Sequence, residues 1–519
     1  AGGTRSTVRG SFRHAGYQQK WAWKASGEYQ QAHDYELVET YYSADSTASV
    51  IDDPDFDADV MRGQFGLYFD PSPDTRLALN VGGSITDALA VNSLGRAQVR
   101  DLGYHFEHLS YTTPQLYVGA YHTADDWGST YMLPTKAQAM LAGLPKEAAV
   151  QRARIGGQSS LWEAEARYRF RLMPVLDTEF DVGANFRQFR PETDGRLLDD
   201  AARQIRLEQL GIYGQSRTDL SETLRLILAA RLDDHETYGT KLSPKVALVY
   251  QLHADMAVRA TYNQAYQSPS LGNQDILVRV SDLIVARGNG EGFQFANLTG
   301  GPLPARFVDG IAKLKPEENT TFELGFRGVL GNRISVDATG YLSRYRHFIS
   351  PVTPINDLAN GIVVLDDDGN PRREVTLTYL NFGKQTVNGL DVTANTYLTP
   401  GIGASVGLSL IETGTLKGST GFEQPFNTPE AIYTLGLSTR DLVATGVTAD
   451  LALRHVTEFD FASGVYVGTV PAYSVVDLNL AYDRGHDVGV RLTAKNLLGN
   501  RHREFVGGPK IGRMIVTRL

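Results

Sequence analysis

The sequence predicts an all-β fold: a large antiparallel transmembrane β-barrel of about 22 strands, with roughly 21 of them visible in this chain. Three observations lead to this prediction. Apolar and charged side chains alternate along most segments, tight turns alternate with long polar connections, and no apolar run reaches the length of a membrane-spanning helix. We expect residues 1–519 to form a single barrel domain, because no linker, low-complexity tract or internal repeat divides them.

The alternation is clearest in residues 161–173, which read LWEAEARYRFRLM. Successive side chains of a strand point to opposite faces, so one face would be aromatic and aliphatic and the other charged. The first face suits lipid and the second suits the polar lumen of a barrel. The expected lipid-facing residues are Trp162, Ala164, Ala166, Tyr168, Phe170 and Leu172, and the expected lumen-facing residues are Glu163, Glu165, Arg167, Arg169 and Arg171. Residues 21–30, 320–328 and 488–495 repeat the pattern.

The connections between the expected strands are of two kinds. Short turns are predicted at 70–75, 253–255, 331–333 and 399–401, and long polar segments at 33–60, 125–158, 188–203, 268–314 and 350–373. In outer-membrane barrels the short turns lie in the periplasm and the long loops lie outside the cell. The last strand is expected to begin near Ile511. Because closed bacterial barrels have even strand numbers, we expect one further strand ahead of Ala1.

The composition excludes several classes of function. The chain has no cysteine, so disulfides, thiolate metal ligands and cysteine nucleophiles are excluded. Its net charge of −9 argues against nucleic acid as a partner. The 25 Tyr and 21 Phe are numerous, as expected for aromatic girdles at the two membrane interfaces. Ser, His and Asp occur without a nucleophile elbow or a catalytic spacing, so we do not expect an enzyme.

His105, Glu107 and His122 are the best candidate for a metal site. If a tight turn is centred on residues 113–114, His105 faces His122 across a hairpin with Glu107 two residues along, and imidazole suits several transition metals. We favour a polar cluster at the barrel rim over a metal site.

An acidic run at residues 366–370 (DDDGN) offers oxygen ligands for calcium but lacks the later Glu of a full calcium loop. A solvated turn is favoured there, since Asp-Gly is an ordinary turn former. We therefore expect no resident metal and no cofactor.

Aromatic residues in the long loops are the candidates for ligand contact. Exposed loop residues often carry binding function, although some only pack the loops together. These residues are Tyr41, Tyr42, Trp127, Tyr131, Phe293 and Phe295.

Several segments resemble the barrel domain of TonB-dependent outer-membrane receptors. Each motif is degenerate, but their shared order is fairly specific, and together they cover most of the chain. The segments are 9–29 (RGSFRHAGYQQKWAWKASGEY), similar to the first hairpins after the plug; 242–250 (LSPKVALVY) with 258–271, which ends in QSPSL; 314–317 (LKPE) with 322–327 (FELGFR); 381–391 (NFGKQTVNGLD); and 492–498 (LTAKNLL).

The resemblance implies an integral protein of the bacterial outer membrane that imports a scarce nutrient of the siderophore, cobalamin or oligosaccharide class. In that family the extracellular loops capture the nutrient, and TonB moves a plug domain with energy from the inner-membrane proton gradient. The expected partners are outer-membrane lipid, a plug and TonB, with a surface lipoprotein or another partner protein as a further candidate. For this family, the charged row at 163–171 is interpreted as a wall that pairs with the plug or stays hydrated, in preference to a path that guides a polar or anionic solute.

Two features depart from the family. No segment resembles the plug or its TonB-binding box, and the chain ends IVTRL where the family tends to end on an aromatic residue. We interpret both as missing ends of a longer protein, with the plug in cis or in trans. The alternatives are a plugless passive channel, whose selectivity the inward charges would set, and a surface-anchoring or assembly barrel whose loops hold a partner protein. The substrate, the surface partners and the oligomeric state are not encoded in these patterns.

Overall fold

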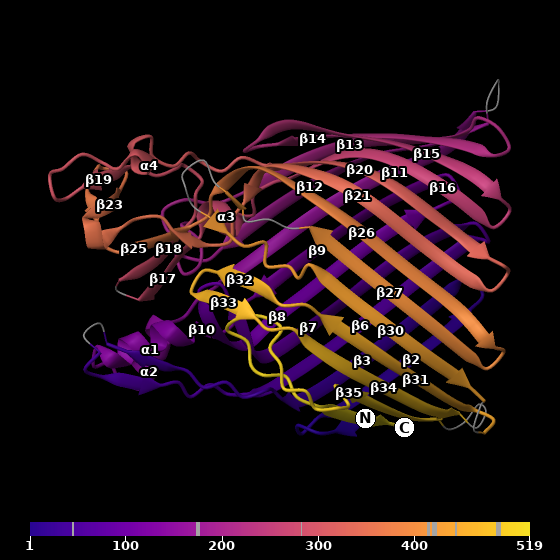
Figure 1. Cartoon of the computed structure of the whole chain (residues 1–519), viewed down its shortest axis with the longest axis horizontal. Helices are drawn as coiled ribbons and strands as arrows, with labels where there is room; N and C mark the ends of the chain where they lie inside the picture. Colours follow the sequence, from indigo (N-terminus) through magenta and orange to yellow (C-terminus); the bar gives the residue numbers. More distant parts are fainter. Residues whose placement is uncertain are drawn as a thin grey trace.

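In the computed structural model, antiparallel strands form a closed wall with short turns at one end and long loops at the other (Figure 1). The structure describes residues 1–519 apart from 44–45, 173–176, 282, 413–415, 418–422, 442–443 and 484–488. Within those residues the wall has 22 strands, which confirms the expected barrel. The wall strands are β1 (Gly2–Gly3), β2 (Val8–Gln18), β3 (Trp21–His33), β6 (Asp57–Ser72), β7 (Thr75–Asn92), β8 (Gly95–Thr112), β9 (Leu116–Asp126), β11 (Gln158–Leu172), β12 (Thr178–Glu192), β13 (Leu207–Asp219), β14 (Leu224–His235), β15 (Gly239–His253), β16 (Met256–Gln267), β20 (Glu317–Leu330), β21 (Ile334–Ile349), β26 (Asn381–Thr399), β27 (Ile402–Glu412), β30 (Ala431–Arg440), β31 (Val447–Val456), β34 (Tyr473–Asp483), β35 (Gly489–Lys495) and β36 (Met514–Arg518).

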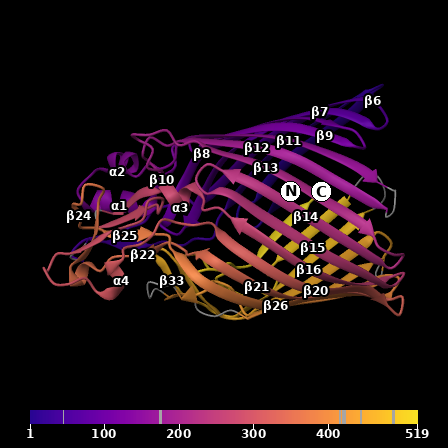
Figure 2. The same cartoon turned by 90° about the horizontal axis from the view of Figure 1, so that it is seen from above.

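The wall closes where the two ends of the chain meet. Gly2 pairs with Val8 of β2 and with Thr517 of β36, so β1 joins the first hairpin to the last strand, and the two termini lie side by side (Figures 1 and 2). The sequence suggested 21 visible strands, whereas the structure has 22. The additional strand is β1, whose two residues are too few to show alternation. The last strand begins at Met514 rather than near Ile511, because Ile511 pairs with His502 in the preceding connection.

The register of β11 separates its two sets of side chains as the alternation predicted. Tyr168 pairs with Val182, and Ala164 pairs with Phe186 on one side and Ala120 on the other, so apolar residues continue across neighbouring strands. Many of the large side chains of this set are exposed, including Tyr168 at 48%. An exposed apolar surface repeated from strand to strand is the surface that a barrel presents to hydrocarbon.

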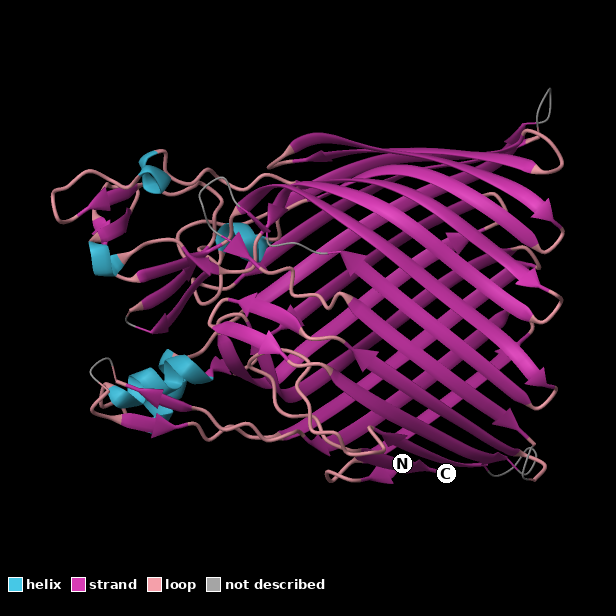
Figure 3. Cartoon of the chain, viewed as in Figure 1, coloured by secondary structure: helices cyan, strands magenta, loops and turns pink. Residues whose placement is uncertain are grey.

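The helices and the short strands gather at the loop end, as Figure 3 shows by colour. We call this loop assembly the crown. Its elements are β4 (Thr40–Tyr42), β5 (Ser49–Ile51), β10 (Tyr131–Met132), α1 (Leu133–Leu141), α2 (Lys146–Arg152), α3 (Leu271–Asp275), β17 (Leu277–Ser281), β18 (Ile284–Arg287), β19 (Phe295–Asn297), α4 (Ala305–Val308), β22 (Thr353–Pro354), η1 (Leu358–Asn360), β23 (Ile362–Leu365), β24 (Pro371–Arg372), β25 (Val375–Thr378), β28 (Leu416–Lys417), β29 (Glu423–Gln424), β32 (Phe459–Ser463) and β33 (Tyr466–Val470). None of the described helices is long and apolar enough to cross a membrane.

The five predicted long connections are present, with slightly different bounds. They run over 34–56, 127–157, 193–206, 268–316 and 350–380. Further long connections link β27 to β30, β31 to β34 and β35 to β36, and the sequence prediction did not include these. The connection after β31 contains the hairpin β32–β33. Its side chains alternate like those of a wall strand, so the sequence pattern does not distinguish it from the wall.

Much of the buried hydrophobic core lies in the crown. The connections 268–316 and 350–380 contribute to two small sheets, β17-β18-β25-β22 and β19-β23-β24. A cluster of Phe295, Phe307, Ile311, Ile355, Ile362, Val364 and Leu380 joins the two connections, and a second cluster around Leu94, Met132, Val278 and Leu377 joins them to β8 and β10. These connections are therefore packed parts of the fold.

Candidate functional site

A buried arginine anchors the first loop of the crown to the wall. Arg96, near the start of β8, donates from Nη2 to Asp52 Oδ2 at 2.8 Å and also to the backbone carbonyl of Leu37. Its Nε lies 3.5 Å from Glu39. The Arg96 and Asp52 side chains are 1% and 0% exposed. A charge at that depth is stable only when it is paired and hydrogen-bonded, so this contact fixes the loop 34–56 over the wall.

The same loop is tied to the first crown helices. Lys136 of α1 and Lys146 of α2 each bind one oxygen of Asp53, at 2.6 and 2.5 Å. Partial burial acts to raise the pKa of Asp53, but the hydrogen bonds from the two ammonium groups outweigh it and hold the pKa below its ordinary value. The connections 34–56 and 127–157 therefore behave as one unit joined by charge.

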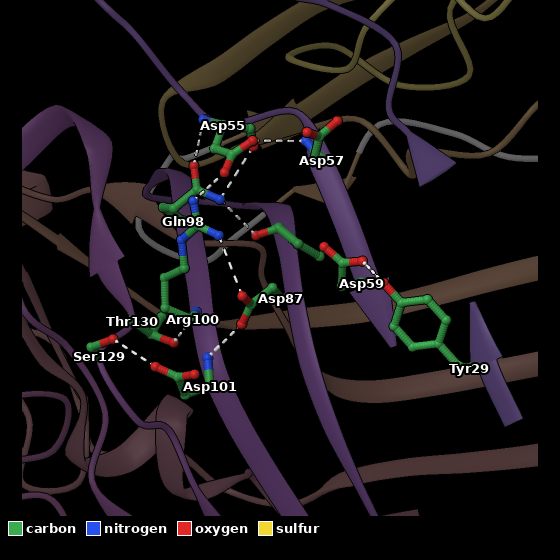
Figure 4. A network of polar contacts seen from close by, with 11 residues as sticks. Tyr29, Asp55, Asp57, Asp59, Asp87, Gln98, Arg100, Asp101, Ser129 and Thr130 are labelled. Atoms are coloured by element: carbon green, nitrogen blue, oxygen red, sulfur yellow. Dashed lines mark hydrogen bonds and ion pairs between the residues drawn. The ribbon is translucent and has the colours of Figure 1, made fainter. Parts of the chain in front are cut away.

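A third polar network continues this anchoring at the loop ends of β7 and β8 (Figure 4). Arg100 binds Asp55 and lies 3.4 Å from Asp87, and the Asp87 carboxylate accepts the backbone N–H of Asp101 at 2.6 Å. The Gln98 side-chain carbonyl accepts the backbone N–H of Asp55 at 2.8 Å. The hydrogen bond from Arg100 keeps the pKa of Asp55 below its ordinary value.

The structure places the six candidate aromatic residues in two different loop groups. In the first group, the Tyr41 hydroxyl donates to Glu39 at 2.7 Å, and burial followed by that carboxylate raises its pKa. Tyr42 beside it is 58% exposed. Tyr131 lies with its ring 5.8 Å from the Lys136 ammonium, and Trp127 packs against Gly156, where a Cβ would come within 2.5 Å of it.

The second group consists of Phe293 and Phe295. Phe295 is only 6% exposed and stacks against Phe307 with ring centroids 4.9 Å apart, and Phe293 packs against the same cluster. This environment favours a packing role for the pair. Tyr42 is the member of the six that offers the most surface to a solute.

The charged row of β11 is paired with neighbouring strands. Glu163 accepts hydrogen bonds from Tyr121 of β9 at 3.2 Å and from Arg187 of β12 at 2.7 Å. The remaining members are also engaged: Glu165 by Tyr213, Arg167 by the face of Tyr117, Arg169 by Asp181 at 3.0 Å and Arg171 by Asp177. The row thus forms a ladder in which Glu163, Arg169 and Arg171 pair with opposite charges and Glu165 and Arg167 contact tyrosines.

A different sector of the polar face carries uncompensated positive charge. Glu28 of β3 binds Arg9 at 2.5 Å and Arg62 at 2.7 Å. A cavity of about 660 Å³ is lined by Glu28 and by Arg62, Arg13 and Arg518, and the last two arginines have no acidic partner among the described residues. Three guanidinium groups around one hollow create a site suited to an anionic group.

The crown contains a second polar cavity, of about 460 Å³, in the connection between β12 and β13. It is lined by Arg190, Arg203 and Arg206 together with Glu192, Asp194 and Asp200. Arg203 also pairs with Asp275 of α3 and so links this connection to 268–316. Three arginines and three acidic residues line this cavity, whereas three arginines and one glutamate line the hollow at Glu28, so this cavity is less selective for anions.

The two candidate metal sites differ in the structure. Asp366 accepts the backbone N–H groups of Asp368 and Asn370 at 3.1 and 2.7 Å, and the second bond is the main reason that its pKa is lowered. The run 366–370 is therefore a turn stabilised by its own carboxylate. His105, Glu107 and His122 do lie together, but Glu107 rather than His105 faces His122 across the hairpin.

Sequence reasoning missed the residues that hold the crown in place. Arg96 and Asp52 are 44 positions apart, and Lys136 is 83 positions from Asp53, so no local spacing signals either pair. The one available signal is an arginine within the short, mostly apolar stretch at 88–97, where a charged side chain needs a buried partner.

A closed wall of 22 strands beneath a crown of long, anchored loops defines a large β-barrel of the membrane-spanning kind. Over residues 23–497 the sequence matches the family described as TonB dependent receptor-like, beta-barrel, and the chain belongs to that family. Members of the family are outer-membrane receptors and transporters rather than enzymes, and the family implies TonB, a plug and outer-membrane lipid as partners.

The fold is similar to those of several solved structures, among them the following three. The siderophore receptor PirA from Acinetobacter baumannii matches with a TM-score of 0.70 and 12% identity, over 99% of this chain and 77% of that one. A mutant ferric enterobactin receptor PfeA from Pseudomonas aeruginosa, in complex with enterobactin, has a TM-score of 0.70 and 14% identity, over 99% and 78%. The copper transporter OprC has a TM-score of 0.68 and 15% identity, over 99% and 78%. At these identities the likeness establishes the fold alone. Comparison with curated protein sequences finds no match.

Proposed function

We propose that this chain is the barrel of an energy-coupled importer, in which the crown captures a scarce nutrient and a plug moved by TonB admits it to the lumen. The observation that carries the proposal is the anchored crown: loops 34–56 and 127–157 are held over the wall by Arg96, Lys136 and Lys146. A receptor that waits for a rare solute benefits from a preformed surface, because ordering loops on binding reduces affinity.

We propose a polar, anionic nutrient, such as a siderophore or an acidic member of the cobalamin or oligosaccharide classes. The hollow lined by Arg13, Arg62 and Arg518 supports an anionic solute, and exposed Tyr42 provides an aromatic contact in the crown. One of the neighbours described above is named a siderophore receptor and another a ferric enterobactin receptor, but the copper transporter shares their fold. The choice of nutrient therefore depends on the charges of this chain rather than on its architecture.

We further propose that the ladder at 163–171 faces the lumen as a wall. Three of its five charges are paired with opposite charges, and the other two, Glu165 and Arg167, have opposite signs, so the ladder offers little net field to a passing ion. This favours the wall interpretation over a selectivity filter, and it favours an importer over a passive channel.

The test is uptake of labelled nutrients by cells that express the complete gene product, with and without collapse of the inner-membrane proton gradient. An importer should accumulate one anionic nutrient, and accumulation should stop when the gradient is collapsed. Accumulation that ignores the gradient would indicate a passive channel, and a stoichiometric surface protein that co-purifies without any uptake would indicate a partner-holding barrel. The intact mass of the natural protein tests the plug, because a plug in cis places the mass well above the 56.9 kDa of this chain.

A further inference from the structure

His105, Glu107 and His122 lie together on one face of the β8–β9 hairpin, near its loop end. On β8 the first two alternate in step with Leu109 and Tyr111, which belong to the exposed apolar set. The paired charges of the β11 ladder lie on the opposite face, because Tyr121, which binds Glu163, is one residue away from His122. The cluster therefore lies on the apolar face of the wall, close to the level where the crown begins.

The carboxylate of Glu107 lies between the two imidazoles. Its Oε2 is 2.8 Å from His122 Nδ1 and its Oε1 is 4.0 Å from His105 Nε2, and one ligand atom from each residue lies within 4.8 Å of the other two. Ligands about 2.0–2.2 Å from a tetrahedral ion stand about 3.3 Å apart. The ligand atoms must therefore move closer together than the 4.8 Å observed. This movement falls mainly on His105, whose side chain is 57% exposed.

His122 is held in place by an aromatic neighbour. His122 stacks on Trp162 of β11, with ring centroids 4.3 Å apart and planes at 27°. Glu107 and His122 are also direct partners in the β8–β9 ladder, so their Cβ positions are set by backbone hydrogen bonds. Two of the three ligands are thus preorganised before any ion binds.

We propose that His105, Glu107 and His122 bind one divalent transition-metal ion, of the Zn²⁺ or Cu²⁺ kind, on the apolar face of the wall. Two imidazoles and one carboxylate suit these ions, whereas Mg²⁺ and Ca²⁺ require more oxygen ligands than the cluster supplies. The ion would link β8 to β9, and its remaining coordination positions would be open to water. The site is independent of the proposed transport, because it lies on the face opposite the charged ladder.

Trp162 supplies a direct readout for the test. The chain has four tryptophans, and in a Trp21→Phe/Trp23→Phe/Trp127→Phe variant Trp162 alone remains. Cu²⁺ is titrated into this protein, purified in detergent without a polyhistidine tag. We expect saturable quenching of Trp162 fluorescence at one equivalent, and recovery of the fluorescence when an excess of EDTA removes the Cu²⁺. Quenching that never saturates would overturn the proposal.

Single variants assign the ligands. His105→Ala leaves the His122–Trp162 stack intact, and we expect it to weaken Cu²⁺ binding at least about tenfold. His108→Ala is the matched control: His108 lies on the same strand but the opposite face, with Nε2 3.3 Å from the Tyr117 hydroxyl, and its loss should leave binding unchanged. Equal binding by His105→Ala and the unmodified protein would contradict the site.

Electron paramagnetic resonance of the Cu²⁺ complex gives a result that needs no substitution at the site. The unmodified chain should show coupling to two imidazole nitrogens. Coupling to fewer than two would overturn the proposal even if the variants failed to fold.

Discussion

Arg96 brings a full positive charge into a part of the crown that excludes water. Its stability there depends on Asp52, which is equally buried, and on the carbonyl of Leu37. Removing one partner of such a pair costs far more than the pair itself contributes, because the other charge remains buried and unpaired. The position of the loop 34–56 thus depends on one side chain of β8.

Arg96→Ala should destabilise the crown by about 3–5 kcal/mol while the wall stays folded. The measurement is hydrogen exchange of residues 46–56, which should lose protection in the variant. Arg76→Ala is the control, since Arg76 pairs with Asp70 on the surface at 2.7 Å and exposed pairs contribute little. Equal protection in Arg96→Ala and the unmodified protein would mean that the loop is held by other contacts.

Asp53 makes the same loop sensitive to acid. Its pKa in the folded protein lies below its ordinary value, so the contacts with Lys136 and Lys146 stabilise the fold fully above about pH 4, the unfolded pKa. This contribution is lost as the pH falls through the lowered folded value. We expect the protection of residues 49–56, measured relative to the intrinsic exchange rate at each pH, to fall on acidification below about pH 4. Asp53→Asn should show faster exchange already at neutral pH and a weaker acid response.

At the scale of single elements, β11 shows how alternation encodes a wall strand. Tyr168 stands in an apolar row that continues through Val182 of β12, and Arg169 pairs with Asp181 on the other face. The backbone of an isolated strand does not determine which of its two faces will contact lipid. Only the neighbouring strands, which repeat the same order, establish one face as the lipid surface.

Substituting Arg at Tyr168 or at Phe326 of β20 should cost about 2–4 kcal/mol if these residues lie near the bilayer midplane. The measurement is urea-induced unfolding in lipid vesicles. Arg169→Gln removes only the ion pairs of a half-exposed arginine with Asp181 and Glu179 and should cost much less. Tolerance at Tyr168 and Phe326 together with sensitivity at Arg169 would mean that the two faces are exchanged.

The hairpin β8–β9 marks the limit of what the sequence could predict. Centring its turn on residues 113–114 places His105 opposite His122, whereas the backbone N–H of Thr113 donates to the Leu116 carbonyl and centres the turn later. A small shift of a turn moves the whole register by two residues, which preserves the faces but changes every partner. The two faces of β11, five of the long loops and a barrel of 22 strands therefore followed from the sequence, whereas three further long connections did not. The buried pairs Arg96–Asp52 and Lys136–Asp53 did not, because they join segments far apart in the chain.

At the scale of the whole molecule, the wall is a continuous ladder without a free edge. Every wall strand is antiparallel to its neighbours, from β1 through β36 and back to β1, in the part of the chain that the structure describes. Closure satisfies the backbone polar groups that lipid cannot hydrogen-bond. Unfolding such a wall requires the loss of many bonds together.

The purified chain should therefore migrate faster on a denaturing gel before boiling than after it, because the closed wall resists detergent at room temperature. Its circular dichroism in detergent micelles should be dominated by β-structure. Helical circular dichroism, or identical migration of heated and unheated samples, would contradict the barrel.

The meeting of β1 with β36 also sets an order of events during biogenesis. Gly2 and Thr517, which pair to complete the ring, are 515 positions apart in the chain. Until the last strand arrives, the nascent sheet has two open edges, and open edges invite pairing with other chains. The cell must guard both edges for the full time of translation and export, and the ring is sealed only as the last step.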